Sequence, residues 1–107
     1  MPARTGAQYL AGLRARQTEV WLNGERVTDV TTHPGLAGGA QAIASLYDQQ
    51  CDPALRDIMT FACPDTGDTL GLSFIIPRTR GDLVRRREMM LRWARTTCGM
   101  MGRSPDF

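Results

Sequence analysis

The residues with the clearest chemical potential stand at the end of the chain, in GMMGRSPDF. The two glycines let the backbone approach a flat ligand or another helix closely. Ser104-Pro105-Asp106 favours a tight turn that would bring Arg103 near Phe107. A guanidinium beside an aromatic ring suits an aromatic anion as ligand, because the guanidinium can pair with the ligand's negative charge and the ring can pack on the ligand's aromatic face. The alternative is a frayed C-terminus, and these residues alone favour neither interpretation.

Other candidate groups point to no self-contained active site. The sequence has no Ser/His/Asp set, H-E-x-x-H, P-loop or G-x-G-x-x-G. Its 3 widely spaced cysteines and single histidine give no zinc pattern, so we expect no metal. His33 lies in a turn without a nearby acid or thiol, which favours a structural role over catalysis.

Arg85-Arg86-Arg87 raises the hypothesis of nucleic-acid binding, but Glu88 and an apolar stripe follow it. No aromatics alternate with the basic residues, as they do in single-strand binders. A solvated helix face is the favoured interpretation.

The composition predicts an ordinary soluble domain. The 107 residues are 42% hydrophobic and 22% charged, and the net charge of +2 is too small to imply an electrostatic partner. An odd number of cysteines suggests reduced thiols and a cytoplasmic location. We find no signal-like start and no apolar run long enough to span a membrane, so we expect no membrane partner.

The first half of the chain carries strong local signals. Thr5-Gly-Ala-Gln8 is typical of a capping box and predicts a helix to about residue 16, buried on its apolar side, Tyr9, Leu10 and Leu13. Asn23-Gly24 predicts a hairpin over residues 19–27, because a type I′ turn needs positive φ at both central residues. Its register pairs Val20 with Val27, Leu22 with Glu25, and Trp21 with Arg26, the last as a surface cation–π pair rather than a ligand platform.

A second helix should follow the His33-Pro34-Gly35 loop. Its apolar face recurs at helical spacing in Leu36, Ala40, Ile43 and Tyr47. Asp52-Pro53 then resembles an N-cap with proline at the first helical position, and it begins a short turn through residue 57.

From residue 59 to residue 76 the apolar period changes to that of strands. Residues 59–62 predict one strand and residues 64–67 a turn. A second, half-buried strand is predicted over residues 70–76, with an alternating face of Leu70, Leu72, Phe74 and Ile76.

Thr79 to Asp82 can cap a last helix over residues 82–97. Its main apolar side gathers Leu83, Val84, Met90, Leu91, Ala94 and Cys98. Met89 and Trp93 form a second patch nearly opposite, and a helix apolar on two sides usually lies between two layers. Arg87 falls within the main stripe, where it would either snorkel outward or pair with a buried acid.

Five blocks, in order, make the sequence similar to a known family. They are RTGAQYL, EVWLNGERVTDVTTHP, SLYDQQCDPALRDIMT, GLSFIIPRTRGDLVRRR and MMGRSPDF. The chain resembles the N-terminal part of the 4-hydroxyphenylacetate 3-hydroxylase family, the oxygenase component of two-component flavin-dependent aromatic hydroxylases. The likeness covers the whole chain but only about the first fifth of a family member.

The predicted elements make an α+β fold, mainly helical with two β-hairpins, and the resemblance implies that it is the N-terminal domain of an acyl-CoA dehydrogenase-like fold. Residues 1–107 would form this single domain, and the flavin-binding β-domain and C-terminal four-helix bundle would be absent from the chain. It also implies the chemistry of a monooxygenase. A separate reductase supplies reduced FAD, and with O2 a phenol such as 4-hydroxyphenylacetate is hydroxylated ortho to its hydroxyl, while the protein positions the ring and excludes water.

The resemblance further assigns a substrate-binding segment, namely Arg103, Ser104, Pro105, Asp106 and Phe107. Arg103 matches an arginine that contacts the phenol oxygen. Phe107 stands where a tyrosine commonly bonds the substrate, and the missing hydroxyl is worth about 1 kcal/mol, so chlorophenols and biosynthetic phenols stay open as substrates. Flavin contacts are expected beyond residue 107. Cys98 has no C-x3-C partner, unlike the related iron–sulfur dehydratases.

We therefore expect the N-terminal portion of a reduced-FAD-dependent phenol monooxygenase that is inactive alone. In the complete protein the resemblance implies a flavin reductase partner and a homo-oligomer, a tetramer. The competing hypothesis is a free-standing small α+β binding or regulatory module without catalysis.

Overall fold

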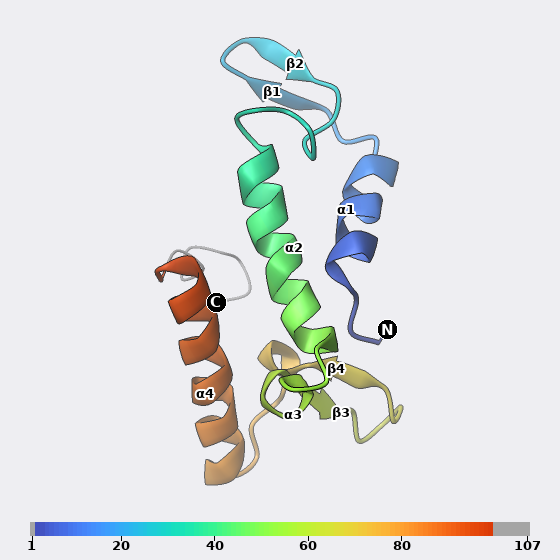
Figure 1. Cartoon of the computed structure of the whole chain (residues 1–107). Coiled ribbons are helices and arrows are strands. Elements are labelled where there is room, and N and C mark those ends of the chain that lie inside the picture. Colours follow the sequence, from blue (N-terminus) through green and yellow to red (C-terminus); the bar gives the residue numbers. More distant parts are fainter. Residues whose placement is uncertain (1, 100–107) are drawn as a thin grey trace. The chain divides into compact units, whose positions relative to one another are not determined.

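The computed structural model describes residues 2–99 (Figure 1). The elements in order are helix α1 (Gly6–Ala15), strands β1 (Val20–Leu22) and β2 (Glu25–Val27), helices α2 (Ala37–Cys51) and α3 (Arg56–Met59), strands β3 (Thr60–Ala62) and β4 (Thr69–Gly71), the 3-10 turn η1 (Leu72–Phe74) and helix α4 (Arg80–Thr97). Two antiparallel hairpins, β1–β2 and β3–β4, accompany the helices, so the predicted α+β class is confirmed. The described residues belong to two compact units: an N-terminal unit of residues 4–48, and a C-terminal unit of residues 2–3 and 49–99.

Helix α1 begins at the predicted capping box. The Thr5 hydroxyl accepts from the Gln8 N–H at 3.1 Å, and the Gln8 side chain accepts from the Thr5 N–H at 2.9 Å. The expected apolar residues Tyr9, Leu10 and Leu13 are half-buried. Tyr9 stacks on Tyr47 of α2 with ring centroids 4.9 Å apart, so aromatic contact adds to the attachment of α1.

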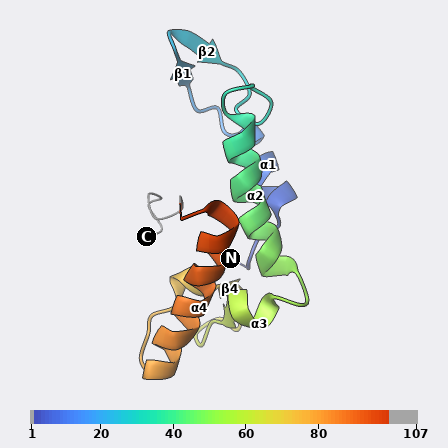
Figure 2. The same ribbon diagram turned by 60° about the vertical axis from the view of Figure 1, so that its left-hand side comes forward.

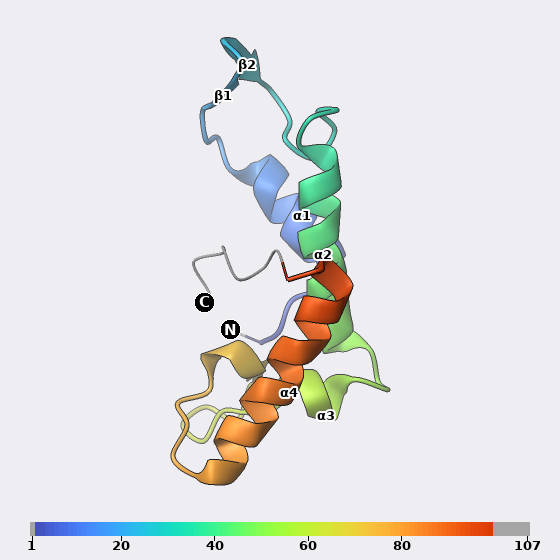
Figure 3. The same ribbon diagram turned by 90° about the vertical axis from the view of Figure 1, so that its left-hand side faces the viewer.

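A close approach of α1 to α2 depends on Gly6. Its N–H donates to the carboxylate of Asp48 at 2.7 Å. A Cβ at this position would lie 2.5 Å from the backbone oxygen of Ala44. The two helices therefore run side by side, as Figures 1 and 3 show, at a separation that only glycine allows.

The first hairpin has the predicted register, in which Val20 pairs with Val27 and Trp21 with Arg26. Asn23 and Gly24 both have positive φ, 52° and 81°, as a type I′ turn requires. The expected cation–π pair between Trp21 and Arg26 is not among the ring contacts of residues 2–99. The indole N–H of Trp21 instead donates to the nearby Glu19 at 2.7 Å, which holds the ring along its own strand.

Helix α2 buries more of its surface than the sequence pattern indicated. Of the predicted face, Ala40 is buried and Leu36, Ile43 and Tyr47 are half-buried. Ala44, Leu46 and Gln50 are buried as well. After the helix, the Asp52 carboxylate accepts from the Ala54 N–H at 2.9 Å, which forms the predicted turn, and α3 begins four residues beyond Asp52.

The second hairpin is shorter than predicted. Strand β4 ends at Gly71, and the chain then makes a 3-10 turn that the Ile75 N–H closes on the Leu72 carbonyl. The turn buries Leu72 almost completely and leaves Phe74 and Ile76 68% and 77% exposed. The strand predicted over residues 70–76 is therefore correct only to Gly71, and the 3-10 turn that follows buries Leu72 but not the other two residues of the predicted face, Phe74 and Ile76.

Helix α4 has the predicted capping box, formed by Thr79 and Asp82, and begins at Arg80. It packs against α3 and η1 (Figure 2), and the core of the C-terminal unit lies there, in Met59, Leu72, Met89 and Trp93. The buried side is thus the patch of Met89 and Trp93. The side predicted as the main one is largely open: Leu83, Val84, Leu91 and Cys98 are exposed, and Met90 and Ala94 are half-buried.

Replacement of Gly6 by alanine should destabilise the protein although alanine favours helices. The new Cβ meets the Ala44 backbone, which cannot move aside alone, as well as the Asp48 carboxylate, so α1 and α2 must separate at a cost of about 1–3 kcal/mol. Gly12→Ala is the matched control, because Gly12 lies within α1 with open space around its Cα and should gain about 0.5–1 kcal/mol. Urea unfolding followed by circular dichroism measures both. Equal effects of the two substitutions would contradict the packing described for Gly6.

The capping role of Asp82 predicts a pH dependence of stability. The backbone N–H of Arg78, followed by that of Thr79, holds the pKa of the Asp82 carboxyl below its usual value. The stabilisation is therefore complete above the unfolded-state pKa of about 4 and is lost as pH falls through the folded-state pKa. Asp82→Asn should lower the melting temperature at pH 7, and the difference from the parent chain should disappear in acid. A difference in melting temperature that persisted unchanged in acid would contradict the capping role of the charged Asp82 carboxylate.

Candidate functional site

The candidate substrate segment, Arg103, Ser104, Pro105, Asp106 and Phe107, lies outside the described residues, and its assignment stays a prediction. The described chain leads to it through the end of α4. There Cys98 and Gly99 take left-handed conformations with φ of 52° and 78°, and the Gly99 N–H donates to the Ala94 carbonyl at 2.9 Å. Helix α4 therefore ends at Thr97, six residues before Arg103.

A groove of about 460 Å³ lies near the first turns of α4 in the C-terminal unit. Its apolar lining is formed by both strands of the second hairpin and the segment after η1, and it includes Phe61, Leu70, Phe74, Ile75 and Ile76. Arg78, Asp82 and Arg85 also line it. Arg85 is held in place because its Nη2 donates to the Thr60 carbonyl at 3.1 Å. The volume falls in the range of small-molecule pockets.

Cys63 in this groove has a chemically distinct environment that the sequence pattern did not reveal. Hydrogen bonds from the Thr66 hydroxyl, from the Thr66 N–H and from the Asp65 N–H hold the pKa of the Cys63 thiol below its usual value. A lower pKa gives a thiol more thiolate character at neutral pH. A partial signal was the turn predicted directly after Cys63, but the orientation of its N–H groups toward the thiol is seen only in the structure. None of the three cysteines, all within the described residues, forms a disulfide.

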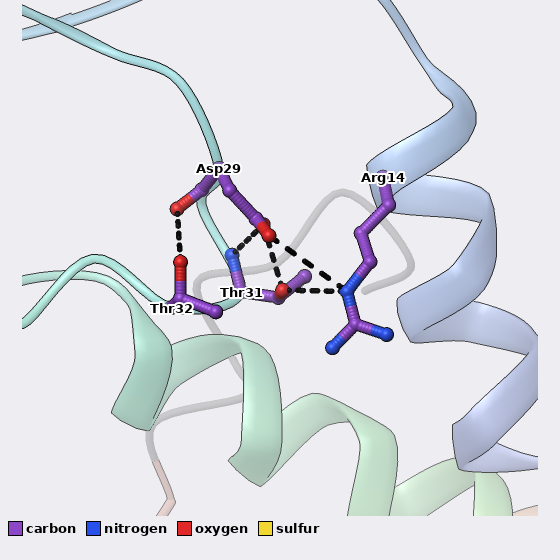
Figure 4. A network of polar contacts seen from close by, with 4 residues as sticks. All are labelled: Arg14, Asp29, Thr31 and Thr32. Atoms are coloured by element: carbon purple, nitrogen blue, oxygen red, sulfur yellow. Dashed lines mark hydrogen bonds and ion pairs between the residues drawn. The ribbon is translucent and has the colours of Figure 1, made fainter.

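A polar network in the N-terminal unit joins α1 to the loop after β2 (Figure 4). The Asp29 carboxylate accepts from the Thr31 N–H at 2.8 Å and from the Thr31 hydroxyl at 2.7 Å. Arg14 Nε donates to the Thr31 hydroxyl at 2.9 Å and lies 3.8 Å from Asp29 Oδ2. The Thr31 hydroxyl bond is the main cause that lowers the Asp29 pKa. These groups satisfy one another, so the network is structural.

His33 also has a structural position. Its Nδ1 accepts from the Gly35 N–H at 3.0 Å, which stabilises the turn before α2. Within residues 2–99, no cluster of three or more His, Cys, Asp or Glu side chains could hold a metal ion. Across the same residues, no helix is both long and apolar enough to cross a membrane.

The three consecutive arginines of α4 have three different environments. Arg85 is fixed to the backbone of β3, Arg86 is half-buried with its Nε buried, and Arg87 is exposed. Successive helical residues are about 100° apart, so the run does not form one cationic face. Charge of this kind gives no continuous track for a phosphate backbone.

The N-termini of α1 and α4 carry side-chain partners at the positions where a diphosphate could bind. A diphosphate commonly binds to free N–H groups at the N-terminus of a helix. At α1 the Gly6 N–H already donates to the Asp48 carboxylate. At α4 the Thr79 and Asp82 side chains fill the cap, and the Asp82 charge would repel a phosphate. The expectation that the flavin contacts lie beyond residue 107 stays a prediction.

Comparisons with known proteins agree on one family. Residues 5–107 match the family described as 4-hydroxyphenylacetate 3-hydroxylase N terminal. The chain is 46% identical, over 98% of its length, to the oxygenase component of 4-hydroxyphenylacetate 3-monooxygenase from Thermus thermophilus, of which it covers 21%. It is 44% identical, over 96% of its length, to a Streptomyces globisporus monooxygenase that acts on a 3-amino-3-(3-chloro-4-hydroxyphenyl)propanoyl group on a peptidyl-carrier protein, of which it covers 19%.

A solved structure gives the same result for the fold. It is the oxygenase component of 4-hydroxyphenylacetate 3-monooxygenase complexed with FAD and 4-hydroxyphenylacetate. The match has a TM-score of 0.88 at 46% identity and covers 97% of this chain and 21% of that one. The chain thus spans about a fifth of the length of the relatives that it matches. From this near-complete match of sequence and fold, the chain belongs to the 4-hydroxyphenylacetate 3-hydroxylase family and corresponds to its N-terminal part.

Proposed function

We propose that this chain is the N-terminal domain of a reduced-FAD-dependent monooxygenase that ortho-hydroxylates a phenol to a catechol. The observation that carries the proposal is the 46% identity, over nearly the whole chain, to an oxygenase whose structure contains FAD and 4-hydroxyphenylacetate. The flavin, supplied in reduced form by a separate reductase, would provide the oxidising chemistry with O2. The flavin-binding β-domain and the four-helix bundle would lie beyond residue 107.

In this proposal the segment from Arg103 to Phe107 contributes one wall of the substrate site. The Arg103 guanidinium would donate a hydrogen bond to the phenol oxygen and favour the phenolate form of the substrate, which makes the substrate ring more nucleophilic. Ser104, Pro105 and Asp106 would form the turn that brings Phe107 over the substrate. These roles come from matching positions in the family and from the chemistry of the side chains.

Phe107 restricts which phenol can be named as the substrate. A phenylalanine supplies the ring face of the expected tyrosine but not its hydroxyl, so any substrate group that bonded this hydroxyl must find another partner or water. Family members act on different phenols. The Streptomyces relative, for example, acts on a chlorinated hydroxyphenyl group on a carrier protein. We therefore propose the substrate class, a para-substituted phenol, rather than one compound.

The proposal includes partners and context. The complete protein would accept reduced FAD from a flavin reductase, assemble as a homo-oligomer and work in the cytoplasm. A free-standing binding or regulatory module is not favoured, since the chain matches the start of much longer enzymes along nearly all of its length.

The first test separates the domain from the complete enzyme. The 107-residue chain, given a flavin reductase, NADH and FAD, should form no catechol from 4-hydroxyphenylacetate, because the flavin contacts would be missing. The polypeptide encoded through and beyond codon 107 should hydroxylate a para-substituted phenol under the same conditions. Liquid chromatography of the products measures both. Turnover by the 107-residue chain alone would contradict the assignment of the flavin site to later segments.

The second test addresses Arg103 in the complete protein. Arg103→Ala should lower kcat by about 100-fold or more, as expected when a charged group that stabilises a developing charge is lost. Arg26→Ala is the matched control, since Arg26 is an exposed hairpin arginine and should leave kcat unchanged. Stopped-flow absorbance of the flavin together with product yield measures the step. A normal rate in Arg103→Ala would remove this residue from the substrate site.

A further inference from the structure

One side of α4 is apolar yet uncovered by the rest of the C-terminal unit. Leu83, Val84 and Leu91 are 55%, 49% and 46% exposed. Arg87 lies among them and is exposed as well. We call these four residues the outer stripe of α4. A group of large apolar side chains exposed together on one helix is a common mark of an interaction surface.

The outer stripe has the geometry of a helix-packing ridge. Leu83, Arg87 and Leu91 are spaced four residues apart, so they form one row of about 12 Å along the helix. Such i, i+4 rows fit into the grooves of a second helix. The row lies opposite Met89 and Trp93, which are buried at 0% and 4% exposure. Helix α4 is therefore buried on one side, and its opposite side presents a row of side chains against which a second helix could pack.

Arg87 defines the chemistry that a partner must have. Among the described residues of the C-terminal unit, Arg87 has no hydrogen bond or ion pair. A guanidinium that becomes covered by an apolar partner must keep a carboxylate or equivalent acceptor, because an unpaired buried charge is very costly. The fitting partner is thus an apolar helix with an acidic side chain opposite Arg87.

Two sources could supply this helix: a later part of the same polypeptide or a second copy of this chain. The relatives extend for about four-fifths of their length beyond the matched region. A tethered segment is present at millimolar effective concentration, which favours it over a free second molecule. We propose that the outer stripe of α4 packs against an acidic-apolar helix of the polypeptide that follows residue 107, and that Arg87 pairs with its carboxylate. The inference rests on the proposed function in one respect, that the chain belongs to a longer enzyme.

Cysteine labelling in the full-length protein tests this contact. Leu91→Cys should react with a maleimide about tenfold or more slowly than Arg92→Cys, the adjacent exposed position outside the stripe. Mass mapping separates these sites from the three native cysteines. In the 107-residue chain the two positions should react alike. Equal labelling rates at the two positions in the full-length protein would overturn the proposal. Protection of Leu91→Cys in the 107-residue chain that increases with protein concentration would also overturn it, because such protection would identify a second copy as the partner.

A charge substitution tests the second half of the proposal. In the full-length protein Arg87→Glu should lower Tm by several degrees, Arg87→Lys should retain most of the stability, and Arg92→Glu should change it little. An equal effect of glutamate at positions 87 and 92 would exclude the carboxylate partner. Hydroxylation is measured on the same preparations as an independent readout. If Leu91→Cys is protected from the maleimide but no phenol is hydroxylated, the interface is supported and the proposed function is rejected. If a phenol is hydroxylated but Leu91→Cys is not protected, the proposed function is supported and the interface is rejected.

Discussion

The burial of Met89 and Trp93 determines how the C-terminal unit is built. Each large apolar side chain removed from water contributes roughly 1.5–3 kcal/mol, and these two lie where α4 meets α3 and η1. The capping box at Thr79 and Asp82 sets where the helix begins, but its exposed hydrogen bonds do not decide which side of the helix is buried. Core burial therefore sets the rotation of α4, and that rotation places Arg85 at the Thr60 carbonyl and turns Leu83 and Leu91 outward.

Features set by neighbouring residues were predictable, and features set by distant contacts were not. Both capping boxes and the type I′ turn depend on groups within four positions of each other, so their sequence signals were sufficient. The strand predicted over residues 70–76 ends at Gly71, because the chain there turns into η1, which buries Leu72 in the core. A helical wheel identifies two apolar sides of α4 but not which of them the fold covers. The larger group proved to be the exposed one, and only the tertiary contacts of Met89 and Trp93 could decide this.

The same distinction applies to the candidate site. Side-chain chemistry alone left the segment from Arg103 to Phe107 equally open to two interpretations, because an arginine and an aromatic at a turn occur in many contexts. The order of five blocks along the chain resolved the family, since independent matches in order rarely coincide. Cys63 shows the opposite case. Its environment comes from three hydrogen bonds of one turn, and the sequence indicates the turn but not the direction of its N–H groups.

The arginine run shows why position on a helix matters more than local charge. Arg85, Arg86 and Arg87 are consecutive, and a rotation of about 100° per residue sends each to a different environment. Arg85 donates a hydrogen bond to β3, and Arg86 is half-buried. Arg87 is exposed within the apolar outer stripe, where no acidic side chain of the C-terminal unit pairs with it. A guanidinium in such a row is stable only while water solvates it or a carboxylate meets it. Covering the row with a second layer would therefore select a partner by charge as well as by shape.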